Sequence, residues 1–183
     1  MIPQIIGLYS PAPQSGKSLV AKYLEEFYGY KIIPFAQTLK EMLVPMLTAY
    51  GYSECEARHY IYSHKQHRLD YLGVTVRHLL QTLGTEWGRQ CVHPHLWIEC
   101  WRRQVSNTAY VVVDDVRFPN EAELVRKVRG PDQGELWCVE RASAVRGTEH
   151  ASEGSLDLWA FDELVYNNGT VSELYESIDR LMQ

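Results

Sequence analysis

Three consecutive residues near the N-terminus, Gly16, Lys17 and Ser18, are of the types that bind the phosphate groups of a nucleotide. In such a site the exposed backbone N–H groups of a loop and a helix N-terminus face the anion. The lysine ammonium reaches the terminal phosphates, and the serine hydroxyl can bind Mg²⁺. We expect Ser15 and Leu19, on either side of the tripeptide, to belong to the same site.

The surrounding pattern supports this interpretation. The apolar run Ile5–Tyr9 predicts a buried strand, and the apolar residues after Ser18 have the spacing of an amphipathic helix, so that strand, loop and helix follow the order of a P-loop. The alternative is a chance tripeptide at a helix start. One residue departs from the P-loop pattern, because Pro11 stands where a glycine is expected. Proline has no N–H and a fixed φ, so we interpret Pro11 and Pro13 as stiffening the loop.

A second group of charged residues follows the apolar run Ala109–Val113, which predicts a central parallel strand buried on both faces. Asp114 and Asp115 come directly after it, and Arg117 two residues later. Ligands of open α/β sheets bind at the carboxyl ends of strands, where a carboxylate can hold Mg²⁺ or its water shell. The alternative is that the two aspartates cap a helix starting near Pro119.

A predicted helix from Thr75 to about Cys91 carries Arg77 and Gln81 four residues apart on one face, with Arg89 near its end. These side chains could hold a phosphate and a base edge, and an ordinary solvated face explains them equally well. Its predicted buried stripe consists of Val76, Leu79, Leu80, Leu83 and Trp87.

Two further segments are polar. Arg141 and Arg146 follow the predicted strand Gly134–Glu140, and an arginine-bearing lid there would neutralise a migrating phosphoryl group and exclude water. Residues 51–73 contain His59, His64 and His67 in a spacing that fits no standard ligand set. We interpret this segment as a solvated substrate flap, with a metal site as the alternative.

The composition is that of a globular protein. The 183 residues are 45% hydrophobic, and the net charge of −5 gives no support to binding of nucleic acid or anionic membranes. The four scattered cysteines predict buried thiols in a reducing compartment, and no stretch could span a bilayer. We therefore expect a cytoplasmic protein (host cytoplasm if viral). The sequence leaves open whether it is a monomer or a homodimer.

The remaining elements complete an α/β pattern. The sequence predicts strands over Tyr30–Phe35 and Glu163–Tyr166, and helices over Ala36–Tyr50, His95–Val105 and Thr170–Leu181. Alternation of strands and helices predicts a parallel sheet of about five strands covered by helices.

Several motifs in this order resemble the phage deoxynucleoside monophosphate kinases, relatives of adenylate and thymidylate kinases. Besides the P-loop, the matching stretches are residues 34–36, 76–89, 96–97, 115–122, 150–153 and 168–170. The resemblance implies a P-loop NTPase-type three-layer fold in one domain, residues 1–183, with a helical substrate-binding region over about 36–107 and a lid over about 141–160.

The resemblance also implies an activity and a site. The chain would transfer the γ-phosphoryl group of ATP to deoxynucleoside 5′-monophosphates with Mg²⁺, giving the diphosphate and ADP and so supplying DNA precursors. Gly16, Lys17 and Ser18 would hold ATP and Mg²⁺. Asp115, and less so Asp114, would order the Mg²⁺ shell or the acceptor phosphate.

For the acceptor and the transferring group, the resemblance implies the following residues. The acceptor phosphate would be bound by Arg77, Arg89 and Arg117, the base by Gln81 and Trp87, and the substrate also by Glu121 and His150. Arg141 and Arg146 would close over the transferring group.

Two other functions stay open at this point. One is a P-loop kinase for another small acceptor, such as dephospho-coenzyme A or a sugar acid. The other is a nucleotide-binding module without turnover. The sequence does not specify which bases are accepted, or whether deoxyribose is preferred to ribose.

Overall fold

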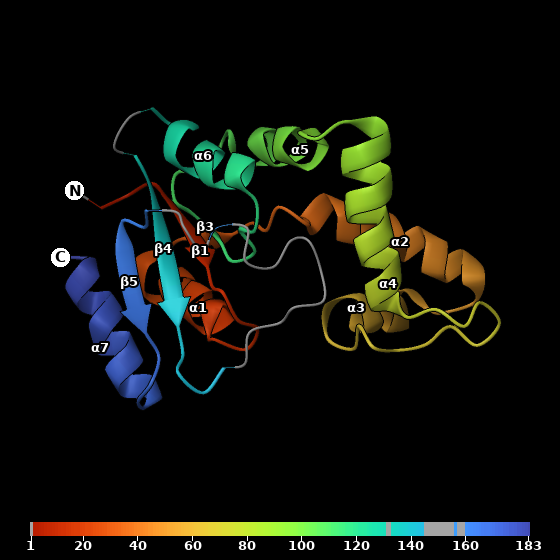
Figure 1. Ribbon diagram of the computed structural model, residues 1–183, viewed down its shortest axis with the longest axis horizontal. Coiled ribbons are helices and arrows are strands. Elements are labelled where there is room, and N and C mark those ends of the chain that lie inside the picture. Colours follow the sequence, from red (N-terminus) through yellow and green to blue (C-terminus); the bar gives the residue numbers. More distant parts are fainter. Residues whose placement is uncertain (1, 131–132, 145–155, 157–159) are drawn as a thin grey trace. The chain divides into compact units, whose positions relative to one another are not determined.

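The chain separates into two compact units, shown together in Figure 1. The computed structural model describes residues 2–130, 133–144, 156 and 160–183. The first unit, which we call the sheet unit, comprises Met1–Pro34 and Arg102–Gln183, and the second, the helical unit, comprises Phe35–Trp101. Apart from its first residue, the helical unit lies within the stretch of about 36–107 for which the resemblance implied a helical substrate-binding region.

The sheet unit is built on five parallel strands, which confirms the predicted fold class. The strands lie in the order β2-β3-β1-β4-β5, and every neighbouring pair is parallel. Their bounds are β1 Ile5–Tyr9, β2 Lys31–Ile32, β3 Val111–Val113, β4 Gly134–Glu140 and β5 Glu163–Tyr166. β1 is central, and each of its residues is buried, as a parallel strand covered on both faces requires.

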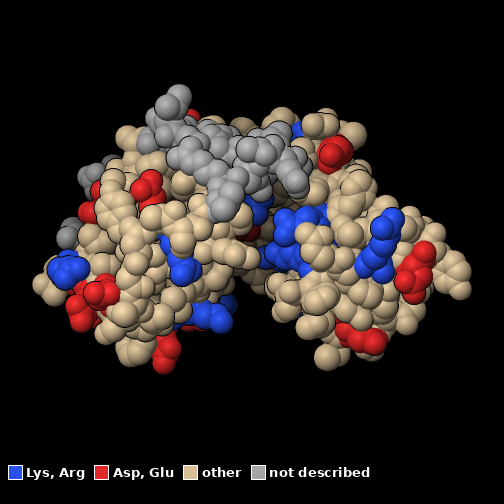
Figure 2. All heavy atoms as spheres, turned by 60° about the horizontal axis from the view of Figure 1, so that its bottom comes forward, with Lys and Arg blue, Asp and Glu red and all other residues tan. Residues whose placement is uncertain are grey.

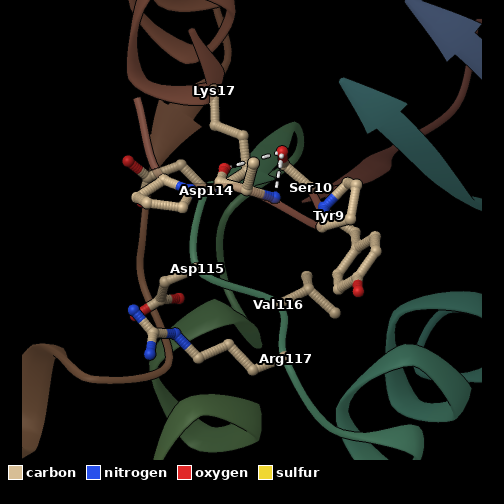
Figure 3. Close-up of a pocket in the computed structure, with 10 residues that line it drawn as sticks. Tyr9, Ser10, Lys17, Asp114, Asp115, Val116 and Arg117 are labelled. Atoms are coloured by element: carbon tan, nitrogen blue, oxygen red, sulfur yellow. Dashed lines mark hydrogen bonds between the residues drawn. The ribbon is translucent and has the colours of Figure 1, made fainter. Parts of the chain in front are cut away.

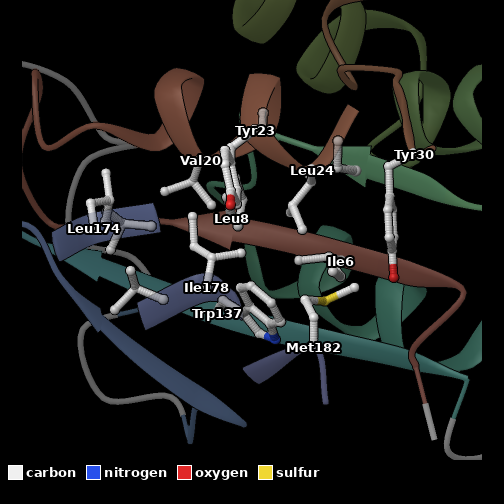
Figure 4. Close-up of a cluster of buried hydrophobic side chains, with 14 residues drawn as sticks. Ile6, Leu8, Val20, Tyr23, Leu24, Tyr30, Trp137, Leu174, Ile178 and Met182 are labelled. Atoms are coloured by element: carbon white, nitrogen blue, oxygen red, sulfur yellow. The ribbon is translucent and has the colours of Figure 1, made fainter. Parts of the chain in front are cut away.

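Helices cover both faces of this sheet. α1 (Lys17–Tyr28) and α7 (Val171–Leu181) pack on one face, where a buried cluster joins Leu24, Trp137 and Ile178 (Figure 4). α6 (Pro119–Lys127) packs on the other face. There β4 begins with Gly134, and a Cβ at this position would lie 1.9 Å from the carbonyl oxygen of Val125, so only glycine permits this approach.

The second strand is shorter than predicted. The sequence indicated a strand over Tyr30–Phe35, but β2 contains only Lys31 and Ile32. The N–H of Ile33 still bonds the Val112 carbonyl at 3.0 Å, and the next residue, Pro34, has no N–H with which to continue the ladder.

The helical unit has its own hydrophobic core. It contains α2 (Gln37–Tyr50), α3 (Glu54–Tyr62), α4 (Val76–Gln81), a π-helix η1 (Thr82–Val92) and the start of α5 (Leu96–Val105). The core consists of Leu43, Val44, Leu47, Ala57, Ile61, Leu69 and Val76.

The prediction of a solvated flap over residues 51–73 is wrong for the part that forms α3. Ser53 caps this helix, and its backbone N–H bonds the Glu56 carboxylate at 2.8 Å in a capping box. Ala57 and Ile61, one turn apart, then enter the core. His67 stacks on Tyr60 with ring centroids 3.7 Å apart, which places this histidine in an aromatic cluster.

The helix predicted over Thr75–Cys91 is also different. Thr75 caps it as predicted, accepting a hydrogen bond from the His78 N–H, but after Gln81 the backbone forms the π-helix η1. In a π-helix the backbone hydrogen bonds join residues five apart instead of four. Side chains that α-helical spacing would place on one face therefore lie on different faces. Trp87, predicted to be buried, is 43% exposed, and of the predicted stripe only Val76 is fully buried.

The structure bears on two predictions, that the cysteines are buried thiols and that no stretch spans a bilayer. Cys138 is a buried thiol as predicted, whereas Cys55 and Cys91 are exposed. Among the helices of the described residues, none combines the length and the apolar character needed to cross a bilayer.

The N-terminal cap of α7 can be tested, because the Thr170 side chain forms it. The Thr170 hydroxyl accepts a bond from the Glu173 N–H at 3.3 Å, and the Thr170 N–H donates to the Glu173 carboxylate. We expect Thr170→Ala to reduce the free energy of unfolding by about 1 kcal/mol, since an N-cap hydroxyl is lost. Chemical denaturation measures this change. Thr170→Ser keeps the hydroxyl and is the control. Equal stability of the alanine and serine variants would contradict the prediction.

Candidate functional site

The loop between β1 and α1 has the backbone of an anion-binding turn. α1 begins at Lys17 directly after Gly16, which has a φ of 107°, and Gln14 has a φ of 59°. Left-handed residues next to a helix start turn successive N–H groups toward one point, where they can surround an anion. A non-glycine residue in this region is uncommon, so surrounding contacts must hold Gln14 there.

The structure also explains how the loop accommodates Pro11. Among the described residues other than glycine, only Gln14 has a positive φ, so the position of Pro11 requires no left-handed backbone. The hydroxyl of Ser10 bridges the turn, donating to the Ala12 carbonyl at 2.9 Å and accepting from the Ala12 N–H at 3.2 Å. The turn therefore forms without a glycine at position 11.

The interior of the loop contains two buried polar side chains. Ser15 is 1% exposed, and within the part of the chain that the structure describes its hydroxyl has no hydrogen-bond partner. A buried hydroxyl without a partner is costly, so a ligand oxygen would stabilise it. Asn167, at the end of β5, donates from its side-chain amide to the Ser15 carbonyl at 2.8 Å. Asn167 was not among the site residues predicted from the sequence, because no local motif connects it to the loop 152 residues away.

The two sets of site residues predicted from the sequence, one around Lys17 and one after Val113, line the same cavity. Residues 9–13 and Lys17 line it together with residues 114–117, and its volume is about 90 Å³ (Figure 3). They meet because β1 and β3 are parallel neighbours, so the loops that follow Tyr9 and Val113 leave the same edge of the sheet. The Ser18 hydroxyl donates to the Asp114 carboxylate at 3.0 Å.

Glu121 organises the loop that carries Arg117. Its side chain is 3% exposed, and its carboxylate accepts the backbone N–H groups of Arg117 at 2.8 Å and Phe118 at 3.1 Å. These are the N–H groups that precede α6, so Glu121 caps this helix. The helix cap predicted as the alternative role of Asp114 and Asp115 is thus supplied by Glu121, and the two aspartates line the cavity.

The electrostatic surroundings of Lys17 combine opposite effects. Burial lowers the pKa of Lys17, and the positive charge of Arg117 lowers it further, whereas Asp114 and Asp115 act to raise it. Both causes of the decrease penalise the ammonium ion, so an additional anion in the cavity would favour the charged form of Lys17.

The donor set fits phosphate groups and a hard cation. Backbone N–H groups, an ammonium and a guanidinium suit phosphate oxygens, while a hydroxyl beside a carboxylate supplies the oxygen ligands that Mg²⁺ prefers. No group of three or more His, Cys, Asp or Glu side chains with metal-binding geometry occurs among the described residues. A cation held by few protein oxygens and by phosphate groups agrees with this arrangement.

Four predicted acceptor residues lie in the helical unit. Arg77 is exposed in the first turn of α4, and Gln81, one turn later, is half-buried. Trp87 lies in η1, and the guanidinium of Arg89 donates to the Pro94 carbonyl at 3.3 Å. Arg77 and Gln81 thus share one face of α4, as predicted.

A buried tryptophan supports η1. The indole N–H of Trp97, which is 3% exposed, donates to the Gly84 carbonyl at 2.8 Å. A Cβ on Gly88 would lie 2.5 Å from this ring, so the glycine permits the close contact. The second glycine of the Leu-Gly-Thr-Glu-Trp-Gly-Arg segment, Gly88, therefore has a structural reason.

The predicted lid is described only at its start. Arg141 is exposed, and the N–H of the following Ala142 donates to the Asn168 side-chain oxygen at 2.7 Å. Arg146 and His150 lie outside the described residues.

On the face drawn in Figure 2, the charged side chains form small groups of either sign with uncharged surface between them.

Comparison with known proteins identifies the family. The model of the deoxynucleotide monophosphate kinase family matches residues 51–178. The deoxynucleoside-5′-monophosphate kinase of Escherichia phage T5 is 37% identical over 102 residues, a match that covers 52% of this chain and 40% of the phage protein. An inferred deoxynucleotide monophosphate kinase of Acanthamoeba polyphaga mimivirus is 28% identical over 184 residues, covering 90% of this chain and 89% of that protein.

Among solved structures, a mutant of the Mycobacterium tuberculosis APS kinase aligns with 98% of this chain and 96% of its own, at a TM-score of 0.40 and 15% identity. The family model covers more than two thirds of the sequence and includes the matching stretches 76–89, 96–97, 115–122, 150–153 and 168–170. The chain therefore belongs to the deoxynucleotide monophosphate kinase family.

Proposed function

We propose that this protein transfers the γ-phosphoryl group of ATP to deoxynucleoside 5′-monophosphates, yielding deoxynucleoside diphosphates and ADP for DNA synthesis. Family membership supports the reaction class. The observation that carries the proposal is the cavity in which Lys17 lies with Asp114, Asp115 and Arg117. It combines cationic groups for phosphate with carboxylates for a cation, which is the equipment of phosphoryl transfer.

The donor phosphates bind at the P-loop in this proposal. The backbone N–H groups of Ser15, Gly16 and Ser18 and the ammonium of Lys17 surround the phosphates, because α1 begins there and the first N–H groups of a helix have no partner within it. Leu19 adjoins this site, and its own N–H donates to the Gly16 carbonyl at 2.9 Å. The buried Ser15 hydroxyl is a further donor to a phosphate oxygen. These residues bind and orient the donor.

The Mg²⁺ site consists of the Ser18 hydroxyl with Asp114 and Asp115. Asp115 is the aspartate favoured by the family resemblance, and the 3.0 Å contact between Ser18 and Asp114 supports including Asp114. When bound, Mg²⁺ would neutralise phosphate charge. The two aspartates hold the cation or its waters and offset the repulsion between Lys17 and Arg117.

The acceptor nucleotide is bound by the residues that the family resemblance implies. Arg77, Arg89 and Arg117 bind the acceptor phosphate, and Gln81 and Trp87 contact the base, through a hydrogen bond and ring stacking respectively. Glu121 fixes the backbone that carries Arg117. His150 completes the substrate site in this proposal.

Arg141 and Arg146 neutralise charge on the transferring group. A general base is unnecessary, because the attacking atom is already a phosphate oxyanion, so positioning and charge neutralisation supply the rate. The partners are small nucleotides rather than nucleic acid or membranes, and the proposed compartment is the cytoplasm of the host cell.

The proposed activity can be tested by measuring ADP release from Mg-ATP with each common deoxynucleoside and ribonucleoside monophosphate. We expect turnover with one or more deoxynucleotides. Lys17→Ala should lower kcat/KM at least about 100-fold, since a group that stabilises the transferring phosphates is lost.

Lys22→Ala is the matched control, because Lys22 is an exposed lysine of the same helix. It should leave turnover unchanged, and both variants should keep the wild-type circular dichroism. Full activity of Lys17→Ala would refute the assignment of the P-loop. No turnover with any monophosphate, from protein that still binds ATP, would instead favour another acceptor or a binding module.

The contributions of the two aspartates can be separated by Mg²⁺ titration of the reaction. We expect Asp114→Asn to raise the Mg²⁺ concentration for half-maximal rate about tenfold, because the carboxylate beside Ser18 loses its charge. Asp115→Asn should raise it less if Asp115 acts through the cation's waters. An unchanged Mg²⁺ requirement in the Asp114 variant, with a raised requirement in the Asp115 variant, would reverse the assignment.

A further inference from the structure

We propose that Asn167 is a positioning residue that holds the P-loop in its anion-binding conformation and thereby determines the affinity for ATP. This inference rests on the proposed function, because it concerns the site of the phosphoryl donor. Asn167 follows β5 and is 152 residues away from Ser15 in sequence. It contacts no substrate in this proposal.

The first supporting observation is a buried hydrogen bond. The side-chain amide of Asn167 donates to the Ser15 carbonyl at 2.8 Å, and the exposed fractions of the two residues are 9% and 1%. The backbone of Asn167 is itself fixed, since its N–H donates to the Glu140 carbonyl at 2.7 Å at the end of β4. The loop is therefore tied to two strands of the sheet.

The second observation is the packing of Gly16 against the same amide. A Cβ on Gly16 would lie 2.4 Å from the Asn167 amide nitrogen. Gly16 is the residue with a φ of 107° that ends the loop and starts α1. The Asn167 side chain therefore restrains two consecutive loop residues, one by a hydrogen bond and the other by contact.

The consequence follows from backbone strain in the loop. Gln14 has a φ of 59°, a conformation that non-glycine residues rarely adopt unless their surroundings impose it. Without the Asn167 amide, the buried Ser15 carbonyl loses its partner, and the loop gains freedom to leave this conformation. Its N–H groups then no longer converge before ATP binds, so part of the binding free energy must order them.

The test compares Asn167→Ala, Asn167→Asp and wild type. The alanine removes the donor, and the aspartate keeps the shape but replaces the donor by an oxygen facing the Ser15 carbonyl. As a matched control, Asn107→Asp makes the same chemical change at an exposed residue between α5 and β3. For each protein, calorimetry gives the Kd of Mg-ATP without acceptor, and kinetics give kcat and both KM values.

We expect the Kd and KM for ATP to rise about tenfold or more in both Asn167 variants, with the KM for the monophosphate changed less than twofold. Asn107→Asp should match the wild type. The two KM values separate positioning from general structural support, since partial unfolding would reduce kcat without raising the KM for ATP alone.

An unchanged Kd for ATP in folded Asn167→Ala would overturn the proposal, as would an equal rise of both KM values. If the aspartate variant fails to fold, the alanine variant decides, because it introduces no charge. Failure of the proposed function has a different result: the wild type would then bind ATP without phosphorylating any monophosphate, while the effect of Asn167 on ATP affinity would still be measured by calorimetry.

Discussion

The structure depends on one backbone constraint, the left-handed Gly16 that ends the P-loop and begins α1. Its left-handed conformation turns the chain from the loop into the helix, and its backbone is packed against the Asn167 side chain at the end of β5. Such packing requires β1, β4 and β5 to be parallel and in register, because only then do their carboxyl ends lie at one edge of the sheet. The sheet thus positions the loop, and the loop supplies the groups that can bind an anion.

Charge balance is the second feature of the site. Lys17 and Arg117 share a cavity with Asp114 and Asp115, so the cavity carries both signs of charge before any ligand enters. Repulsion from Arg117 and burial lower the pKa of Lys17, and the two carboxylates oppose that effect. An anionic nucleotide with a divalent cation adds charges of both signs, which compensates both pairs of protein groups.

The division into two units separates the roles proposed for the residues. The sheet unit contains the P-loop and the carboxylates, and it has the parallel topology common to phosphate-binding α/β proteins. The helical unit contains Arg77, Gln81, Trp87 and Arg89, on α4 and on the π-helix that follows it. π-helical turns are rare and often occur at functional sites, so η1 is consistent with a substrate-binding role for this segment.

Features that depend on neighbouring residues were predictable from the sequence alone. The bounds of β1, β4 and β5, the caps at Thr75 and Thr170, and the P-loop follow from apolar runs, capping residues and short motifs. Such features depend on interactions within a few residues of the chain, which is why pattern is sufficient to predict them. The capping box at Ser53 was equally local, and the helix it begins was overlooked because polar and aromatic residues obscured its two buried positions.

Only the tertiary structure decided the features that depend on distant contacts. The π-helix after Gln81 coincides with the packing of Trp97 on Gly84 and Gly88, which α-helical periodicity cannot anticipate. The pairing of Ser18 with Asp114 spans 96 residues, and that of Ser15 with Asn167 spans 152. The sequence determined which residues could do the chemistry. The fold determined which of them meet, because the order and register of parallel strands select the loops that share one edge of the sheet.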